Sequence, residues 1–330
     1  MTSWLLPFLL WGGTDQDPQE VRFLPPGAME AHAEAPALAG RVTVIHWPDD
    51  EHRIQRIFRV LEAHHHLPGL PAGVPTYARI YLAPDRERFD ALTGGRVPDW
   101  GAGVALPGLR RIVIPLFSSP WGDPWGEDRT LRHEWAHVGL HEYLDGLRIP
   151  RWFDEGYAQL ASGSWSIQEG WRLRLALASG RAPSLDTLSL TWPRDRTSAE
   201  LAYLLSATAV EYMVAGSGER GLESFLRRWR EEGSFETSLR QTFGHTTTSF
   251  EAGWRDYVRR RYGWFYVLSQ SVVFWALLSI LVLFLFHRRR IRDRERLARL
   301  RAQEPPDDPA YWTWAADRDV RNPGPGGSPG

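Results

Sequence analysis

Five consecutive residues, His133-Glu134-Trp135-Ala136-His137, constrain the fold of this chain more than any other feature of its sequence. On an α-helix, residues four apart project from the same face, so His133 and His137 can both reach one metal ion. Glu134 follows the first histidine and can face a water molecule on that ion. Zinc is the metal favoured by nitrogen and oxygen ligands in an open tetrahedral site. The motif therefore predicts a helix that carries two zinc ligands and a general base.

A catalytic zinc site needs a third protein ligand. The best candidate is Glu155, in a segment where Pro150 and the pattern after it predict the start of a second helix. Residues 144–149 are expected to form a turn that folds this helix back beside the first and brings Glu155 near the imidazoles. The predicted metal ligands are therefore His133, His137 and Glu155.

Two neighbouring residues need separate consideration. His141 lies four residues after His137, but three ligands in one straight stripe would span about 12 Å of helix axis, too far for bonds of about 2.1 Å to a single ion. We therefore expect His141 outside the ligand set. Asp154 has two equally good roles: it orients a ligand histidine through a hydrogen bond, or it complements the dipole at the start of its helix.

This ligand set implies a particular chemistry. Two neutral imidazoles and one carboxylate leave a zinc site with a net charge of about +1, which lowers the pKa of a bound water toward neutrality. Glu134 can then take the proton of the water as it attacks a polarised carbonyl, and pass the proton to the leaving amine. The sequence thus predicts a zinc-dependent hydrolase.

Sequence patterns divide the body of the chain, residues 40–262, into a sheet part at 40–125 and a helical zinc-binding part at 126–262. Strands are predicted at 41–47, 77–82 and 111–115, where the patterns are typical of strands, and a helix is predicted at 50–65. Further helices are predicted at 127–144, 151–162, 166–179, 197–215, 219–231 and 247–261. A mixed sheet followed by helices is an α+β arrangement.

The segment 264–286 carries no charged residue. A helix that rises about 1.5 Å per residue can cross a hydrocarbon core of about 30 Å over this length, so one transmembrane helix is predicted. Arginines follow it at positions 288, 289, 290, 292, 294, 296, 299 and 301. Positive charge on this side indicates a cytoplasmic C-terminus and an N-terminal body outside the cytoplasm. The tail 287–330 is expected to be basic at first and then disordered.

The N-terminus and the composition bear on export, on the kinds of site that are possible and on binding partners. Residues 1–20 contain a short apolar run that is similar to part of a signal peptide but lacks a positive first region, so a packed or disordered N-terminus is an equal alternative. The chain has no cysteine, which excludes disulfides, thiolate metal sites and a cysteine nucleophile. Its net charge of -1 gives no drive toward nucleic acid.

The zinc motif, followed by PRWFDEGYA at 150–158, resembles the gluzincin branch of the zincin metallopeptidases, and in particular the bacterial peptidase MA-like group. The resemblance implies a zincin-like fold, the ligands His133, His137 and Glu155, and the base Glu134. It covers about residues 40–262, with weaker similarity at 100–105, 111–114, 201–212 and 251–257.

Gluzincins also use a tyrosine or histidine to hold the developing oxyanion. The resemblance points to Tyr203 for this role, and a core aromatic on an amphipathic helix is the alternative. Aminopeptidases of this clan carry a glutamate before the zinc helix, whereas residues 101–105 contain no acid, so aminopeptidase activity is not expected. The strand at 111–115 could instead pair along its edge with an extended peptide.

Together these features predict a zinc endopeptidase that acts on peptides or proteins, tethered by a single span to a bacterial cell membrane with its catalytic domain extracytoplasmic. Two other hypotheses stay open. One is a non-catalytic binding or scaffold protein at the membrane that keeps the zincin fold, and the other is a hydrolase of a non-peptide amide.

Overall fold

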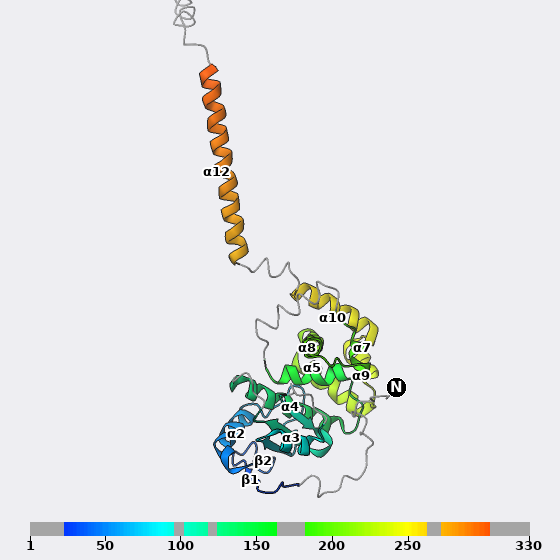
Figure 1. Ribbon diagram of the computed structural model, residues 1–330. Coiled ribbons are helices and arrows are strands. Elements are labelled where there is room, and N and C mark those ends of the chain that lie inside the picture. Colours follow the sequence, from blue (N-terminus) through cyan, green and yellow to red (C-terminus); the bar gives the residue numbers. More distant parts are fainter. Residues whose placement is uncertain (1–22, 96–101, 118–123, 164–181, 263–271, 304–330) are drawn as a thin grey trace, which may run out of the picture. The chain divides into compact units, whose positions relative to one another are not determined.

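The computed structural model describes residues 23–95, 102–117, 124–163, 182–262 and 272–303 (Figure 1). The chain divides into two compact units, Met1–Tyr266 and Val267–Gly330. The first unit holds a sheet and most of the helices, and the second holds one long helix. The possible signal segment at 1–20, the predicted helix at 166–179 and the end of the tail lie outside the described residues.

The sheet has five strands in the order β1-β2-β3-β5-β4. Their bounds are Met29–His32 for β1, Val42–His46 for β2, Ala78–Ala83 for β3, Val104–Leu106 for β4 and Arg111–Pro115 for β5. The three central strands run parallel, and β1 and β4 are antiparallel to their neighbours. The strands predicted at 41–47, 77–82 and 111–115 are confirmed as the central three, whereas the two short edge strands were not predicted.

The two faces of the sheet enter different cores because side chains alternate along each strand. Val44, Ile80 and Ile112 belong to the main core, which also contains residues of the helices after the sheet. On the other face, Tyr81 packs with Phe89 of α3 (Arg86–Thr93). A 3-10 turn (Pro48–Arg53) and helix α2 (Ile54–Ala63) follow β2, where one helix at 50–65 was predicted, and a second 3-10 turn (Pro107–Leu109) precedes β5.

The position of β5 corrects one hypothesis. The strand was expected to pair along its edge with an extended peptide, but β5 lies between β3 and β4. β3 pairs with β5 along Arg111–Pro115, and β4 pairs with it from Arg111 to Val113. The hypothesis is therefore wrong, because a three-residue strand that the sequence did not reveal occupies the edge. In the described part of the sheet, the strand with one unpaired edge next to the helical half is β4.

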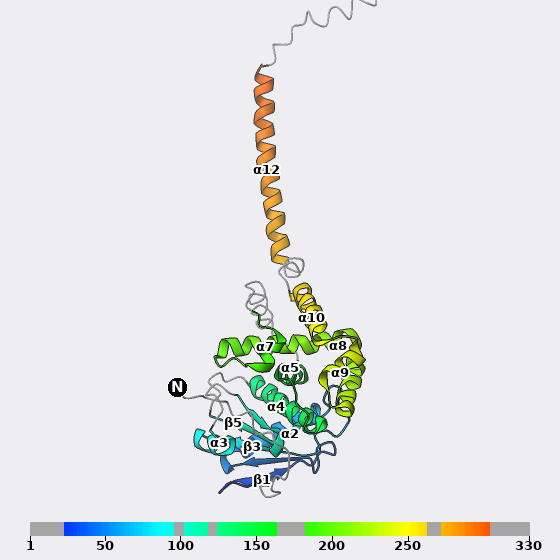
Figure 2. The ribbon, with the colours of Figure 1, turned by 90° about the vertical axis from the view of Figure 1, so that its right-hand side faces the viewer.

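The helical half begins with the two helices that carry the zinc motif and Glu155. Its described helices are α4 (Pro124–Leu144), α5 (Arg151–Ala161), α7 (Leu185–Leu190), α8 (Arg196–Glu232), α9 (Phe235–Phe243) and α10 (Thr247–Tyr262). The helices predicted at 127–144, 151–162 and 247–261 are confirmed, and α7 and α9 were not predicted. Figures 1 and 2 show α4 between the sheet and α5, with α8 packed against α5.

A tight turn reverses the chain between α4 and α5. Asp145 and Gly146 both adopt positive φ, at 43° and 79°, and so end α4 in left-handed conformations. Pro150 then precedes the first turn of α5. The predicted turn at 144–149 is confirmed, and it places the first turn of α5 beside the middle of α4.

One face of α5 is buried in an aromatic core. The ring of Phe153 lies 5.5–5.7 Å from the rings of Phe225, Trp229 and Phe235, which belong to α8 and α9. The Trp152 ring stacks on another aromatic ring, that of Phe250 in α10, at 5.9 Å. Such pairs contribute about 0.5–1.5 kcal/mol each beyond simple burial. The opposite face of the first turn is thereby left to face α4.

Two glycines determine how α8 packs. Gly218 has φ 68° and ψ −175° and breaks α8 into two segments, which agrees with the two helices predicted at 197–215 and 219–231. Gly156 lies at the crossing of α5 and α8, where an added Cβ would be 2.3 Å from the carbonyl oxygen of Ser206. The two helices therefore meet at backbone contact, which only glycine permits.

The second unit contains α12 (Val272–Gln303), which joins the apolar residues after 271 to the arginine-rich segment in one helix. The first eight residues of the predicted span at 264–286 lie outside the described residues. Among the helices of the described ranges, none is both long enough and apolar enough to cross a lipid bilayer.

The close approach of α5 and α8 predicts the effect of Gly156→Ala. A methyl group at this position cannot avoid the backbone of Ser206, so we expect a loss of about 1–3 kcal/mol in the free energy of unfolding, measured by urea denaturation. The control is Gly216→Ala on α8, where an added Cβ meets nothing within 4 Å. The control should gain about 0.5–1 kcal/mol from helix propensity. Equal stability of Gly156→Ala and the wild type would contradict the packing.

Candidate metal centre

Three side chains from α4 and α5 converge on one point. Nε2 of His133 lies 3.4 Å from Oε2 of Glu155, Nε2 of His137 lies 3.5 Å from the same oxygen, and the two Nε2 atoms are 3.2 Å apart. All three side chains are largely buried, with exposed fractions of 11–14 %. The structure thus brings together the three residues that the sequence predicted as ligands.

These spacings fit a tetrahedral metal ion. Ligands bonded at about 2.0–2.1 Å in tetrahedral geometry lie about 3.3–3.4 Å from one another, and the three observed distances are 3.2, 3.4 and 3.5 Å. The donor set, two imidazole nitrogens and one carboxylate oxygen, leaves a fourth position free. Zinc is the ion that this combination suits best.

Asp154 forms a hydrogen bond with His137, the second histidine of the motif. Its Oδ1 lies 2.7 Å from Nδ1 of His137, and its Oδ2 lies 2.8 Å from Nε2 of His141. The carboxylate accepts a hydrogen bond from Nδ1–H, so the neutral form of His137 has its lone pair on Nε2, the atom that faces Glu155 and His133. The first of the two roles considered for Asp154, the orientation of a ligand histidine, matches this contact.

His141 belongs to this supporting group. His137, His141 and Asp154 also converge closely enough to be a possible metal site. Their contacts of 2.7 and 2.8 Å, however, are hydrogen-bond distances, shorter than the separation of two ligands on one ion. His141 therefore reaches the predicted ligand His137 through Asp154.

The charges of the site shift the pKa values of its acids and bases. Burial alone would raise the pKa of Glu155, but hydrogen bonds and positive charge from His133 and His137 lower it to about 2. Burial opposes the shift of Asp154 in the same way, yet its two histidine partners hold its pKa well below the usual range. The pKa of His137 is raised well above its ordinary value, because Asp154 and Glu155 outweigh the effect of burial.

Glu134 lies against the edge strand of the sheet. Its side chain is buried, and burial raises the pKa of its carboxyl group, although His133, His137 and a hydrogen bond with the backbone of Ala105 oppose the shift. Just before β4, Gly103 approaches so closely that an added Cβ would lie 3.3 Å from Cγ of Glu134. The contact of the β4 region with Glu134 was not predicted, because the sequence does not reveal strands this short.

Tyr203, on α8, lies beside the predicted ligands. Its ring is 6.3 Å from that of His133 and 5.2 Å from that of Trp192, edge to face in both cases. Burial raises the pKa of Tyr203 well above its ordinary value, and the charge of Glu155 adds to this. The phenol therefore keeps its proton and can donate a hydrogen bond.

Two further residues near the site were missed at the sequence level. The guanidinium of Arg151 lies 4.7 Å over the ring of Trp192, and its Nε is 3.7 Å from Oε1 of Glu155. Arg151 stands one helical turn before Glu155, so the spacing of the pair was a signal in the sequence. Trp192 follows α7 in a loop, where no local pattern indicates a long-range contact.

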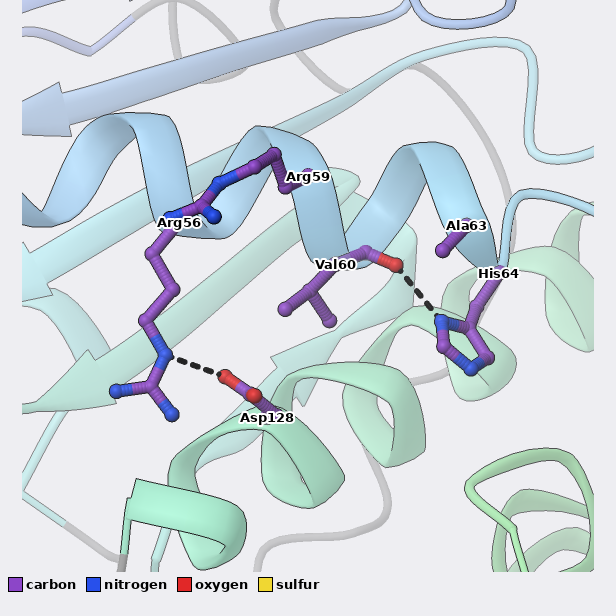
Figure 3. A pocket seen from close by; sticks show the side chains of 6 residues that line it. All are labelled: Arg56, Arg59, Val60, Ala63, His64 and Asp128. Atoms are coloured by element: carbon purple, nitrogen blue, oxygen red, sulfur yellow. Dashed lines mark hydrogen bonds and ion pairs between the residues drawn. The ribbon is translucent and has the colours of Figure 1, made fainter.

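A separate hollow lies on another side of the zinc-motif helix (Figure 3). Its volume is about 300 Å³, and its lining residues are Arg56, Arg59, Val60, Ala63, His64 and Asp128. Arg56 and Asp128 form an ion pair across it at 2.9 Å. None of the three predicted ligands lines this hollow, so it is distinct from the point where they converge.

Comparison with protein families gives one match. The family model described as the Peptidase MA superfamily matches residues 79–260, which extend from β3 to the end of α10 and include every residue of the site described above. No curated protein matches the chain.

The lowered pKa of Glu155 predicts a pH dependence of stability in metal-free, chelator-treated protein. The ordinary pKa is 4.5 and the folded value is about 2, so the stabilisation is complete above pH 4.5 and is lost as the pH falls toward 2. Between pH 6 and 3, the free energy of unfolding of the wild type should fall by about 2 kcal/mol more than that of Glu155→Gln. Urea unfolding at a series of pH values measures both.

The exposed Glu231, replaced by Gln, provides the control, and its curve should run parallel to that of the wild type. Parallel curves for Glu155→Gln and the wild type would mean that Glu155 is not paired with the histidines.

Proposed function

Because the chain belongs to the Peptidase MA superfamily, we propose that it is a zinc-dependent metallopeptidase that cleaves peptide bonds within extended substrates. The observation that carries the proposal is the convergence of His133, His137 and Glu155 at the spacing of a tetrahedral ion, with Glu134 next to the first histidine in the buried motif. Family membership supports the peptidase class. The identity of the metal, the cleavage mode and the residue roles are the further steps proposed here.

The residues fit zinc in their chemistry as well as their spacing. His133, His137 and Glu155 would hold the ion, and Asp154 would keep His137 in the tautomer that coordinates through Nε2. When bound, zinc supplies a Lewis acid that polarises a carbonyl group and acidifies water.

Glu134 serves as the general base. It takes a proton from the attacking water and delivers the proton to the nitrogen of the leaving amine. Burial raises the pKa of this carboxyl group, which brings it closer to neutral pH and suits a group that must both accept and donate a proton. Its contact with the backbone of Ala105 holds the carboxyl group next to β4.

Tyr203 serves as the donor that stabilises the negative charge on the carbonyl oxygen during attack. Its phenol stays protonated because burial and the nearby Glu155 raise its pKa. Its ring packs against those of His133 and Trp192, and this proximity to a predicted ligand supports the role. A donor fixed in this way costs little reorganisation when the charge develops.

The substrate is proposed to bind as an extended peptide along β4. In the described part of the sheet this strand has one unpaired edge, and the region before it contacts Glu134. Backbone hydrogen bonds to an edge strand hold a peptide without regard to its ends. Residues 101–105 contain no acid that could bind a free amine, which favours an endopeptidase over an aminopeptidase.

A membrane anchor is the second part of the proposal. Residues 264–286 carry no charge, and in α12 large apolar side chains are mostly exposed, for example Leu277 at 61 % and Leu283 at 66 %. Proteins rarely leave such a surface in contact with water. The arginines that follow support a cytoplasmic tail and an extracytoplasmic catalytic unit.

The role of Glu134 predicts a separation of metal binding from turnover. Glu134→Gln should keep the zinc content of the wild type, because Glu134 is not a ligand, and should lower turnover of a peptide library by about 10²–10⁴-fold. In the same assay Tyr203→Phe should keep zinc and lower turnover by about 10²–10³-fold with little change in KM. Glu142→Gln, on the same helix but hydrogen-bonded to the backbone of Thr76, is the matched control with normal turnover.

A zinc-loaded wild type that cleaves no member of a diverse peptide and unfolded-protein library would rule out the peptidase proposal. It would leave the chain as a binding or scaffold protein with a zincin fold.

The anchor predicts that the full chain, expressed in a bacterium, stays in the membrane fraction after an alkaline wash. Arginines at Trp275 and Leu277 should release it, because a charge at the centre of a span costs about 2.5–3.5 kcal/mol. The control places arginines at Leu297 and Leu300, in the basic part of the same helix, and should stay membrane-bound. Release of the wild type by the wash would contradict the anchor.

A further inference from the structure

The carboxylate of Glu155 has two oxygens that face different partners. Oε2 lies 3.4 and 3.5 Å from the Nε2 atoms of His133 and His137. Oε1 lies 3.7 Å from Nε of Arg151. The oxygen paired with both imidazoles is therefore Oε2, and the oxygen paired with the guanidinium is Oε1.

Arg151 is held at two points. It is the first residue of α5, one turn before Glu155, and its guanidinium lies 4.7 Å over the ring of the buried Trp192. Trp192 in turn contacts Tyr203, and Tyr203 contacts His133. These contacts form a closed ring of side chains around one side of the metal centre, in which Arg151 connects Glu155 with the aromatic residues.

We propose that Arg151 is a positioning residue, which presents Glu155 to the metal through Oε2 alone. The inference rests on the zinc centre proposed above. A carboxylate can coordinate through one oxygen or through both, and the second oxygen would add a fifth ligand atom beside the position that a catalytic zinc site keeps open for water. A guanidinium beside Oε1 opposes this, because it supplies that oxygen with a competing positive partner.

Removal of Arg151 has two opposing effects on the affinity for metal. Glu155 loses a partner that orients it, which weakens binding. A positive charge near a divalent cation also disappears, which strengthens binding. Since Arg151 lies 3.7 Å from the carboxylate itself, we expect the charge effect to prevail, so affinity for zinc should not fall, whereas the number of ligand atoms should rise. Disruption of the fold would instead lower the affinity, and this difference makes the role testable.

The test is Arg151→Met in the full chain, loaded with Co²⁺ in place of zinc and examined by visible absorption. The variant should lose absorption intensity, as happens when Co²⁺ changes from four to five ligand atoms. Its Kd for zinc, measured by competition with a chelator, should be equal to or lower than that of the wild type. Turnover should fall about 10–100-fold at unchanged KM.

Two further variants sharpen the result. Arg151→Lys keeps the positive charge and should retain most of the wild-type Co²⁺ spectrum. Arg148→Met removes an exposed arginine three residues earlier and should match the wild type in spectrum, affinity and turnover.

Three outcomes would overturn the proposal. A wild-type Co²⁺ spectrum in Arg151→Met would mean that Arg151 does not control the coordination of Glu155. A weaker zinc affinity together with a lower Tm would assign Arg151 a structural role only. A wild-type protein that takes up neither Co²⁺ nor zinc would instead refute the metal centre itself, so failure of the two proposals can be told apart.

Discussion

The burial of one face of α5 is the constraint on which the geometry of the site depends. Trp152 and Phe153 are fixed in the aromatic core between α8, α9 and α10, and Gly156 lets the backbone of α8 come into contact. Since the helix cannot rotate about its axis without exposing these rings, Asp154 and Glu155 must point toward α4. The hydrophobic core therefore determines the direction of two carboxylates that are themselves polar.

The same region contains several ionisable side chains that are largely buried. The side chains of Glu134, Asp154 and Glu155 gather around His133 and His137, and burial of a carboxylate is costly unless it is paired. Asp154 is shared by two imidazoles, and Glu155 faces two imidazoles on one oxygen and a guanidinium on the other. Asp154 and Glu155 therefore each have their own basic partners. The Nε2 atoms of His133 and His137 meet at one point.

The convergence of the two motif histidines with Glu155 could be predicted because it depends on local patterns. Helical spacing places His133 and His137 on one face, and Pro150 marks the start of the helix that carries Glu155. The contact between the two helices followed from the short turn at 144–149. Tyr203 is a different case, because its proposed place came from a family resemblance and its contact with His133 spans seventy residues of sequence.

The parts that could not be predicted depend on short elements and distant contacts. β1 and β4 have four and three residues, too few for a recognisable alternation, so the edge of the sheet was assigned to β5. The approach of Gly103 to Glu134 and the stacking of Arg151 on Trp192 are tertiary contacts that no periodic pattern encodes. Arg151 differs from Trp192 in that its spacing from Glu155 was visible in the sequence.

The break at Gly218 divides α8 into two segments that pack against different parts of the molecule. The segment before it carries Tyr203 and the backbone of Ser206, which lie beside the metal centre and α5, whereas the segment after it carries Phe225 and Trp229 of the aromatic core. In an unbroken helix, an insertion of one residue would turn every later side chain by about 100°. Because Gly218 interrupts the helix, the two segments do not share one helical register, so a change of length at this point need not turn the aromatic residues of the second segment away from α5.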